Sequence, residues 1–75
     1  MATTQLDATG LKCPIPVLKA RKVVRGLKQG ETLEVLSTDP GSVPDFEAFC
    51  DASGHELLEH TRDGDVFRFL IRISG

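Results

Sequence analysis

Hydrophobic and polar residues follow two different periods along the chain, and the changes of period predict its elements. A short strand is expected over residues 5–8, before the turn residues Thr9-Gly10. A helix is expected from Pro14 to Leu27, where apolar residues recur at helical spacing: Val17, Leu18, Ala20, Val23, Val24 and Leu27. The strand formers of Thr32–Ser37 predict a second strand.

A second helix is expected after the turn Asp39-Pro40-Gly41. Ser42 is predicted to cap it, with Asp45 completing a capping box, and Gly54 is predicted to end it. Its apolar face would consist of Val43, Phe46, Phe49 and Cys50. Cys50 is therefore expected inside the protein, near a helix C-terminus that disfavours a thiolate.

The last third of the chain predicts a β-hairpin with Asp63-Gly64 as its two-residue turn. In that register Arg62 faces Asp65, Glu59 lies opposite Arg68, and Leu57 lies opposite Leu70. One face of the final strand is apolar and needs a cover: Phe67, Phe69, Ile71 and Ile73.

The expected order is therefore β-α-β-α-β-β. Helices with one apolar face need a sheet, and the apolar sheet face needs helices, so a two-layer α/β (α+β) sandwich follows. It has a mixed four-stranded sheet with both helices on one face. A chain of 75 residues permits one domain, over residues 1–75.

Composition excludes several classes of protein. Hydrophobic residues make up 40% and charged residues 27%, which does not suit a disordered tail. No apolar run is long enough to span a membrane, and the N-terminus has no secretory pattern. Two cysteines do not make a disulfide framework, so free thiols and a reducing cytoplasm are expected. The protein is expected to be a monomer on its own.

Charge is distributed unevenly, although the formal net charge is only −2. The stretch from Lys12 to Lys28 holds six basic residues and no acid, while the rest of the chain holds three basic and eleven acidic residues. This asymmetry can steer a protein partner, or it can be a solvated helix face. The candidates for docking are Lys12, Lys19, Arg21, Lys22 and Arg25.

The candidate chemistry centres on Cys13-Pro14-Ile15-Pro16. Cysteine before proline is pushed out of the helical region, and Pro14 suits the first helical position, so Cys13 is predicted at the N-cap. The helix dipole and Lys12 there would lower the pKa of its thiol. The alternative is a small buried cysteine without a functional role.

The chain lacks the additional residues and motifs that other kinds of cysteine chemistry require. His55 and His60 are distant in sequence and predict neither a catalytic dyad nor, with the cysteines, a metal site. No Cys-x-x-Cys pair, phosphate loop or dinucleotide fingerprint is present. An activated cysteine without a base, metal or pocket suits a carrier that passes a group between proteins.

Several segments resemble the TusA/SirA-like sulfurtransferases. The resemblance begins with Leu6-Asp7-Ala8-x-Gly10-Leu11-x-Cys13-Pro14-x-Pro16. It continues through Gly30-Glu31-Thr32-Leu33, Thr38-Asp39-Pro40, Phe49-Cys50, His55-Glu56-Leu57 and Phe69-Leu70-Ile71-Arg72. It implies the same two-layer fold and a cytoplasmic carrier of persulfide sulfur on Cys13, with Asp7, Gly10, Pro14 and Pro16 supporting that residue.

The resemblance also implies partners. The donor would be a cysteine desulfurase or a rhodanese-like protein, and the acceptor a cysteine-bearing protein such as a DsrE-like relay component. The sulfur would serve 2-thiouridine formation in tRNA, dissimilatory sulfur metabolism or cofactor assembly. No cofactor, metal, membrane or direct nucleic-acid contact is expected. The alternative is an RNA-binding or regulatory module. The basic stretch contains no aromatic residue on which a base could stack, and this argues against RNA binding.

Overall fold

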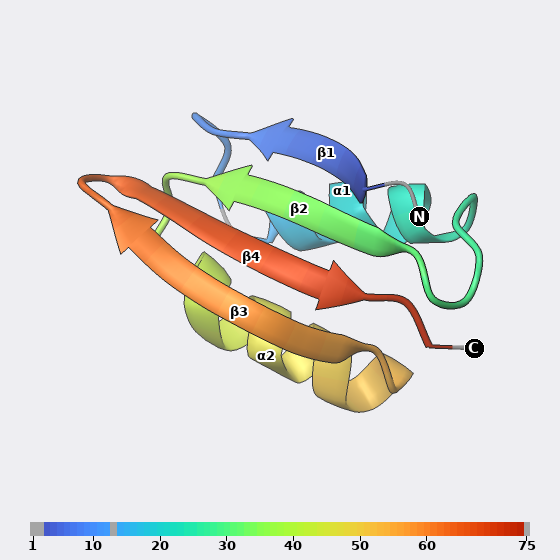
Figure 1. Ribbon diagram of the computed structural model, residues 1–75. Coiled ribbons are helices and arrows are strands. Elements are labelled where there is room, and N and C mark those ends of the chain that lie inside the picture. The colour runs from blue at the N-terminus through green and yellow to red at the C-terminus, as the bar shows by residue number, and fades with distance from the viewer. Residues whose placement is uncertain (1–2, 13, 75) are drawn as a thin grey trace.

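The predicted order of elements is present in the computed structural model, which describes residues 3–12 and 14–74 (Figure 1). The strands are β1 (Thr3–Ala8), β2 (Thr32–Ser37), β3 (Glu56–Asp63) and β4 (Val66–Arg72), and the helices are α1 (Ile15–Val24) and α2 (Ser42–Ser53). Neither helix of the described chain has the length and apolar character needed to cross a bilayer.

The four strands form one mixed sheet in the order β1-β2-β4-β3. β1 and β2 are parallel, and β4 runs antiparallel to both of its neighbours. The two crossovers, β1-α1-β2 and β2-α2-β3, step in the same direction across the sheet, so one crossover handedness places both helices on one face (Figure 1). The fold class expected from the sequence is confirmed.

The core lies between the sheet and the two helices. Alternate residues of β2 and β4 face the helices because strand side chains alternate, and Phe69 and Ile71 are fully buried there, as predicted. The Phe46 ring of α2 stacks on the Phe69 ring with centroids 4.7 Å apart. The buried apolar residues of the described chain are Ala8, Ala20, Leu33, Val35, Phe46, Cys50, Phe69, Ile71 and Ile73.

Helix α1 is shorter than the predicted span of Pro14–Leu27. It begins at Ile15 and ends at Val24, after which Gly26 N–H and Leu27 N–H donate to the carbonyls of Val23 and Val24 in tighter turns. The assignment of Leu18 to the apolar stripe was wrong, because its side chain is 51% exposed. Helix α1 therefore presents an apolar residue to solvent.

The N-cap of helix α2 lies one residue before the predicted cap, Ser42. Gly41 is the N-cap and no side chain caps the helix, so the predicted capping box of Ser42 and Asp45 is wrong. The Ser42 side chain is buried, and its Oγ pairs with Ser37 Oγ at 2.6 Å. Gly54 ends the helix as predicted, with a φ of +80° that favours glycine.

The hairpin exists, but its register is shifted from the prediction. Asp63 pairs with Val66, so the turn residues are Gly64 and Asp65 rather than Asp63 and Gly64. Of these two turn residues, Gly64 has a positive φ, +61°, and Asp65 does not, which suits a turn that needs glycine at its first central position. Glu59 consequently faces Leu70, and its contact with Arg68 is diagonal, with Oε2 and Nη1 3.8 Å apart. A bulge between Leu57 and Glu59 returns Leu57 to the helix-covered face, opposite Ile71.

Candidate functional site

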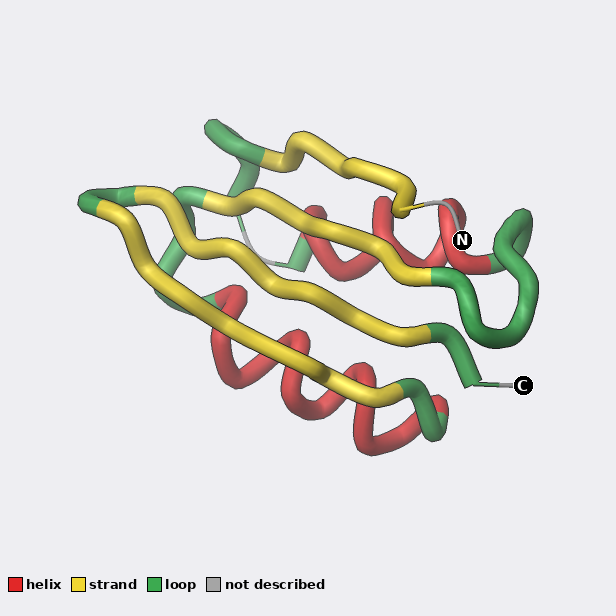
Figure 2. The backbone as a smooth tube through the Cα atoms, viewed as in Figure 1, coloured by secondary structure: helices red, strands yellow, loops and turns green. Residues whose placement is uncertain are grey.

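Three connections gather at one end of the sheet, as Figure 2 shows. They are the β1–α1 loop, the β2–α2 loop and the β3–β4 turn, which meet there because β1 and β2 are parallel and β4 starts beside the end of β2. The β1–α1 loop carries the cysteine predicted to react. Cys13 itself lies outside the described residues, so the site is defined by the residues around it.

The residues on either side of Cys13 are exposed: Lys12 in the loop and Pro14 at the start of α1. Pro14 is the N-cap, since its carbonyl accepts the first helical bond from Leu18 N–H at 3.1 Å. The prediction that Cys13 occupies the N-cap and Pro14 the first helical position was therefore one residue early. Pro16 is buried at the second helical position, where its missing N–H removes no helical bond.

The start of α1 offers few amides to an anion. Ile15 N–H already donates to the Lys12 carbonyl at 2.9 Å, and Pro16 has no N–H. No acidic residue lies in the first turn. The helix dipole therefore acts on a neighbouring negative charge mainly through its field rather than through a set of hydrogen bonds.

Asp7 and Gly10 both shape the path of the β1–α1 loop. The Asp7 carboxylate accepts hydrogen bonds from the Thr9 hydroxyl at 2.6 Å and the Thr9 backbone N–H at 3.0 Å, and these hold the pKa of the Asp7 carboxyl below its usual value. Gly10 has a φ of +80°, in the region that favours glycine. Its N–H donates to Thr38 Oγ1 at 2.8 Å, across to the β2–α2 loop.

Thr38 belongs to the segment Thr38-Asp39-Pro40 that resembles the family, but the sequence pattern predicted no role for it. Thr38 directly follows a predicted strand, and in the structure that strand is parallel to the strand that leads into the Cys13 loop. The carboxyl ends of parallel neighbours lie at the same edge.

The predicted docking residues of α1 form an exposed basic face, which we define as Lys19, Arg21, Lys22 and Arg25. Together with Leu18 these residues line one shallow hollow on the helix surface. Ile15, one turn before, is 42% exposed. The structure thus brings four of the five predicted docking residues together beside two exposed apolar side chains, while Lys12 lies in the preceding loop.

A second groove runs between the two helices and begins at Pro14. It is lined mainly by apolar side chains, including Val17 and Phe49, with Arg21 and Asp45 on its sides. Arg21 therefore borders both this groove and the hollow of the basic face. Of these two surfaces on α1, the groove includes Pro14 at the start of the helix, and the hollow begins at Leu18, about one turn further along.

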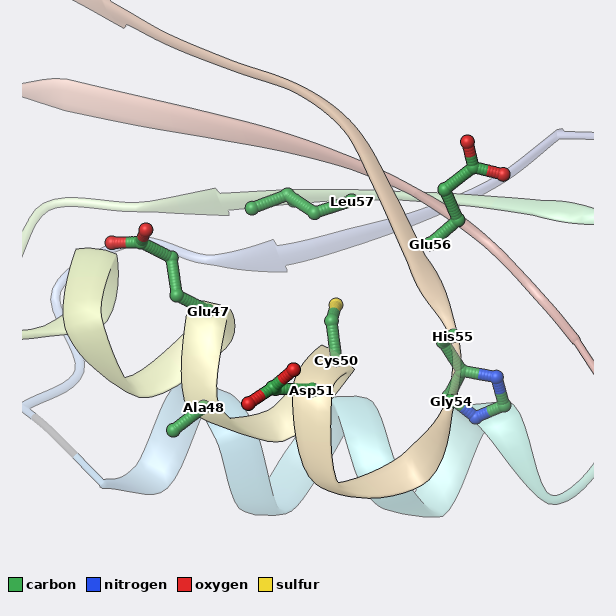
Figure 3. Close-up of a pocket in the computed structure, with 8 residues that line it drawn as sticks. All are labelled: Glu47, Ala48, Cys50, Asp51, Gly54, His55, Glu56 and Leu57. Atoms are coloured by element: carbon green, nitrogen blue, oxygen red, sulfur yellow. The ribbon is translucent and has the colours of Figure 1, made fainter.

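Cys50 lies apart from this loop, on the helix-covered side of the sheet, as predicted. Figure 3 shows its sulfur turned from α2 toward the strands, near Leu57. Its side chain is 5% exposed, and burial raises the pKa of the Cys50 thiol from 9.0 to about 11. Cys50 is a free thiol held in its unreactive form.

The contacts of the two histidines are those of residues that support the fold. His55 Nδ1 accepts a hydrogen bond from Ser74 N–H at 3.1 Å, and its ring lies against that of Phe49. His60 is exposed on β3, where it lies opposite Phe69. Within residues 3–12 and 14–74, no three His, Cys, Asp or Glu side chains are grouped as a metal site would require.

Alkylation should separate the two cysteines. With a pKa of about 11, only about one Cys50 thiol in a thousand is ionised at pH 8, so its modification in the folded protein is expected to be slow and to accelerate with pH. We expect Cys50→Ala to fold and to keep the reactivity of Cys13, with Cys50→Ser less stable because a hydroxyl replaces the buried thiol. Iodoacetamide labelling with peptide mass mapping measures both rates. Equal rates at Cys13 and Cys50 would contradict this assignment.

Comparison with known proteins gives full-length matches. The family model described as sulfurtransferase TusA matches residues 4–73. The sulfur carrier protein TusA of Allochromatium vinosum is 49% identical over 70 residues, covering 93% of this chain and 92% of that protein. The crystal structure of a SirA-like protein from Desulfitobacterium hafniense superposes with a TM-score of 0.84 at 26% identity, covering 99% of this chain and 100% of that one.

Proposed function

Because this chain belongs to the TusA/SirA-like family of sulfur carriers, we propose that it carries sulfane sulfur as a persulfide on Cys13. One observation supports this role above the others. Lys12 and Pro14, the residues on either side of Cys13 in the sequence, are exposed at the start of α1, whereas Cys50 is buried and its thiol has a raised pKa.

Loading is a thiol–disulfide type exchange. The Cys13 thiolate attacks the outer sulfur of a donor persulfide, R–S–SH. A bond forms between Cys13 Sγ and that outer sulfur, the S–S bond within the donor breaks, and the donor leaves as the thiolate R–S⁻. Cys13 is left as Cys13–S–SH, with no net oxidation or reduction.

Unloading repeats the same exchange in the opposite direction. An acceptor thiolate attacks the outer sulfur of Cys13–S–SH, and Cys13 leaves as a thiolate. A thiol that ionises readily leaves easily in this step and supplies more thiolate for the first. Neither step needs a cofactor.

The local electrostatics favour a thiolate near the start of α1. Lys12 directly precedes Cys13, the dipole of the ten-residue helix is positive at this end, and no acid lies in the first turn. Because Ile15 N–H is already bonded and Pro16 has none, the thiolate would be lightly hydrogen-bonded. Such a thiolate keeps its nucleophilicity, which suits a carrier that must accept and release sulfur.

The basic face of α1 is the proposed docking surface for donor and acceptor. It is exposed, its first member Lys19 lies five residues after Pro14, and it lines one hollow together with the exposed side chain of Leu18. A partner with an acidic surface around an apolar contact would match it. The donor is proposed to be a cysteine desulfurase or a rhodanese-like protein, and the acceptor a cysteine-bearing, DsrE-like relay protein, within the reducing cytoplasm.

Intact mass spectrometry tests the proposal. The protein is incubated with a cysteine desulfurase and cysteine, or with a rhodanese-like protein and thiosulfate, and is measured with and without reductant. We expect a gain of one sulfur atom that reductant removes, mapped to the peptide containing Cys13. No gain from either donor would count against the carrier function. A pull-down from the native cell then identifies which donor and acceptor operate.

A further inference from the structure

The β1–α1 loop is tied to the β2–α2 loop by a hydrogen bond between residues far apart in sequence. Gly10 N–H donates to Thr38 Oγ1 at 2.8 Å. Gly10 lies three residues before Cys13 and has a φ of +80°, so the chain changes direction at the point where it is bonded. On the other side of Cys13, α1 begins and Pro16 is buried against the core. Thr38 thus holds one end of a short segment whose other end is held by a helix.

Thr38 is itself held in place on both sides. The preceding Ser37 is fully buried and pairs with Ser42 Oγ at 2.6 Å. The following Asp39 has its N–H 3.3 Å from Ser37 Oγ, and its carbonyl accepts from Ser42 N–H at 3.0 Å. The buried hydroxyl pair therefore anchors the β2–α2 loop to the core, and through Thr38 this anchor extends to the loop before Cys13.

We propose that Thr38 is a positioning residue for Cys13. Its hydroxyl keeps residues 10–12, the segment that leads into Cys13, on one path. This role rests on the proposed function. The physical reason is preorganisation, since a nucleophile on a loop that samples several paths spends less time in the reactive geometry.

The test compares two substitutions of nearly the same size. Thr38→Val removes the hydroxyl and keeps the shape, while Thr38→Ser keeps the hydroxyl and removes a methyl group. Thr32→Val is the matched control, because Thr32 lies at the other end of β2 and also loses a hydroxyl contact, with Thr3 Oγ1 at 2.8 Å. For each variant, the rate of sulfur loading, the pH profile of Cys13 alkylation and the thermal unfolding midpoint are measured.

We expect Thr38→Val to slow loading about 3- to 10-fold, the range set by one neutral hydrogen bond. The pH midpoint of Cys13 alkylation should rise by roughly half a unit, because a thiolate on a less ordered loop is stabilised less by the field of the helix dipole. Thr38→Ser should restore both values, and Thr32→Val should match wild type. A change of folding alone would lower the unfolding midpoint without moving the alkylation midpoint.

The outcomes separate this proposal from the carrier function. If wild type fails to load sulfur, the carrier function is lost, but the alkylation profiles still decide the role of Thr38. If wild type loads and Thr38→Val loads equally fast with an unchanged alkylation midpoint, Thr38 is not a positioning residue. Should Thr38→Val not fold, amide exchange in wild type decides: Gly10 N–H must exchange at least about tenfold more slowly than in an unstructured peptide.

Discussion

Cys13→Ser is expected to carry no sulfur while keeping its fold. A hydroxyl at this position cannot form a persulfide by exchange, because the reaction requires a sulfur nucleophile and a thiolate leaving group. The exposed neighbours Lys12 and Pro14 do not depend on the residue between them for burial, so little loss of stability is expected. Loading should fall to the detection limit in intact mass measurements, while the unfolding midpoint stays within a few degrees of wild type.

The matched control for Cys13→Ser is Cys50→Ala, which removes the other thiol. We expect it to load sulfur at the wild-type rate, since burial holds the Cys50 thiol protonated. Sulfur on Cys13→Ser would place the carrier site at Cys50. A disulfide between the two cysteines during turnover would require a two-cysteine mechanism.

Charge reversal on the basic face is expected to slow sulfur transfer about tenfold per residue at low salt. Lys19, Arg21, Lys22 and Arg25 are replaced singly by Glu, each changing the net charge by the same amount. Exposed charges of one sign accelerate encounter with an oppositely charged partner, and salt screens them over about 8 Å at physiological ionic strength. The loading rates should therefore converge with wild type as salt rises, while the alkylation rate of Cys13 stays nearly unchanged.

Arg72→Glu is the control for those reversals. Arg72 is exposed on β4 and has the same charge, but it projects from the face of the sheet that the helices leave open. This variant should transfer sulfur at close to the wild-type rate at every salt concentration. If all four α1 reversals behave like Arg72→Glu, the basic face is a solvated surface and docking occurs elsewhere. The groove between α1 and α2 would then be the next surface to test.

Local periodicity predicted β2 with the bounds that the structure has, because its alternation has a single explanation. Leu33, Val35 and Ser37 are all buried beneath the helices, and the residues between them face the other side of the sheet. The helical spacing of apolar residues in α1 was equally clear, but these residues cover a wider strip of the helix than the part that packs against the rest of the protein. Leu18 is left outside because Pro16 and Ala20 take the buried positions.

The errors at the ends of elements share a physical cause. The candidate turn Asp63-Gly64 and the actual turn Gly64-Asp65 differ in where glycine stands, and both leave plausible pairs across the hairpin. Ser42 had the character of a cap, but its hydroxyl bonds to Ser37, whose proximity no local pattern reveals. In each case a contact made in the folded state outweighs a local preference.

The pattern along the sequence was sufficient for the order of the six elements, the apolar faces of α2 and β4, and the segment around Cys13 as the candidate site. These depend on period, turn residues and neighbouring chemistry, all within a few positions along the chain. The strand order, the exposure of Leu18 and the contact between Gly10 and Thr38 became known from the folded chain alone. Strand pairing and the contact between Gly10 and Thr38 join residues that are distant in sequence. The exposure of Leu18 depends on how much of α1 the rest of the folded chain covers.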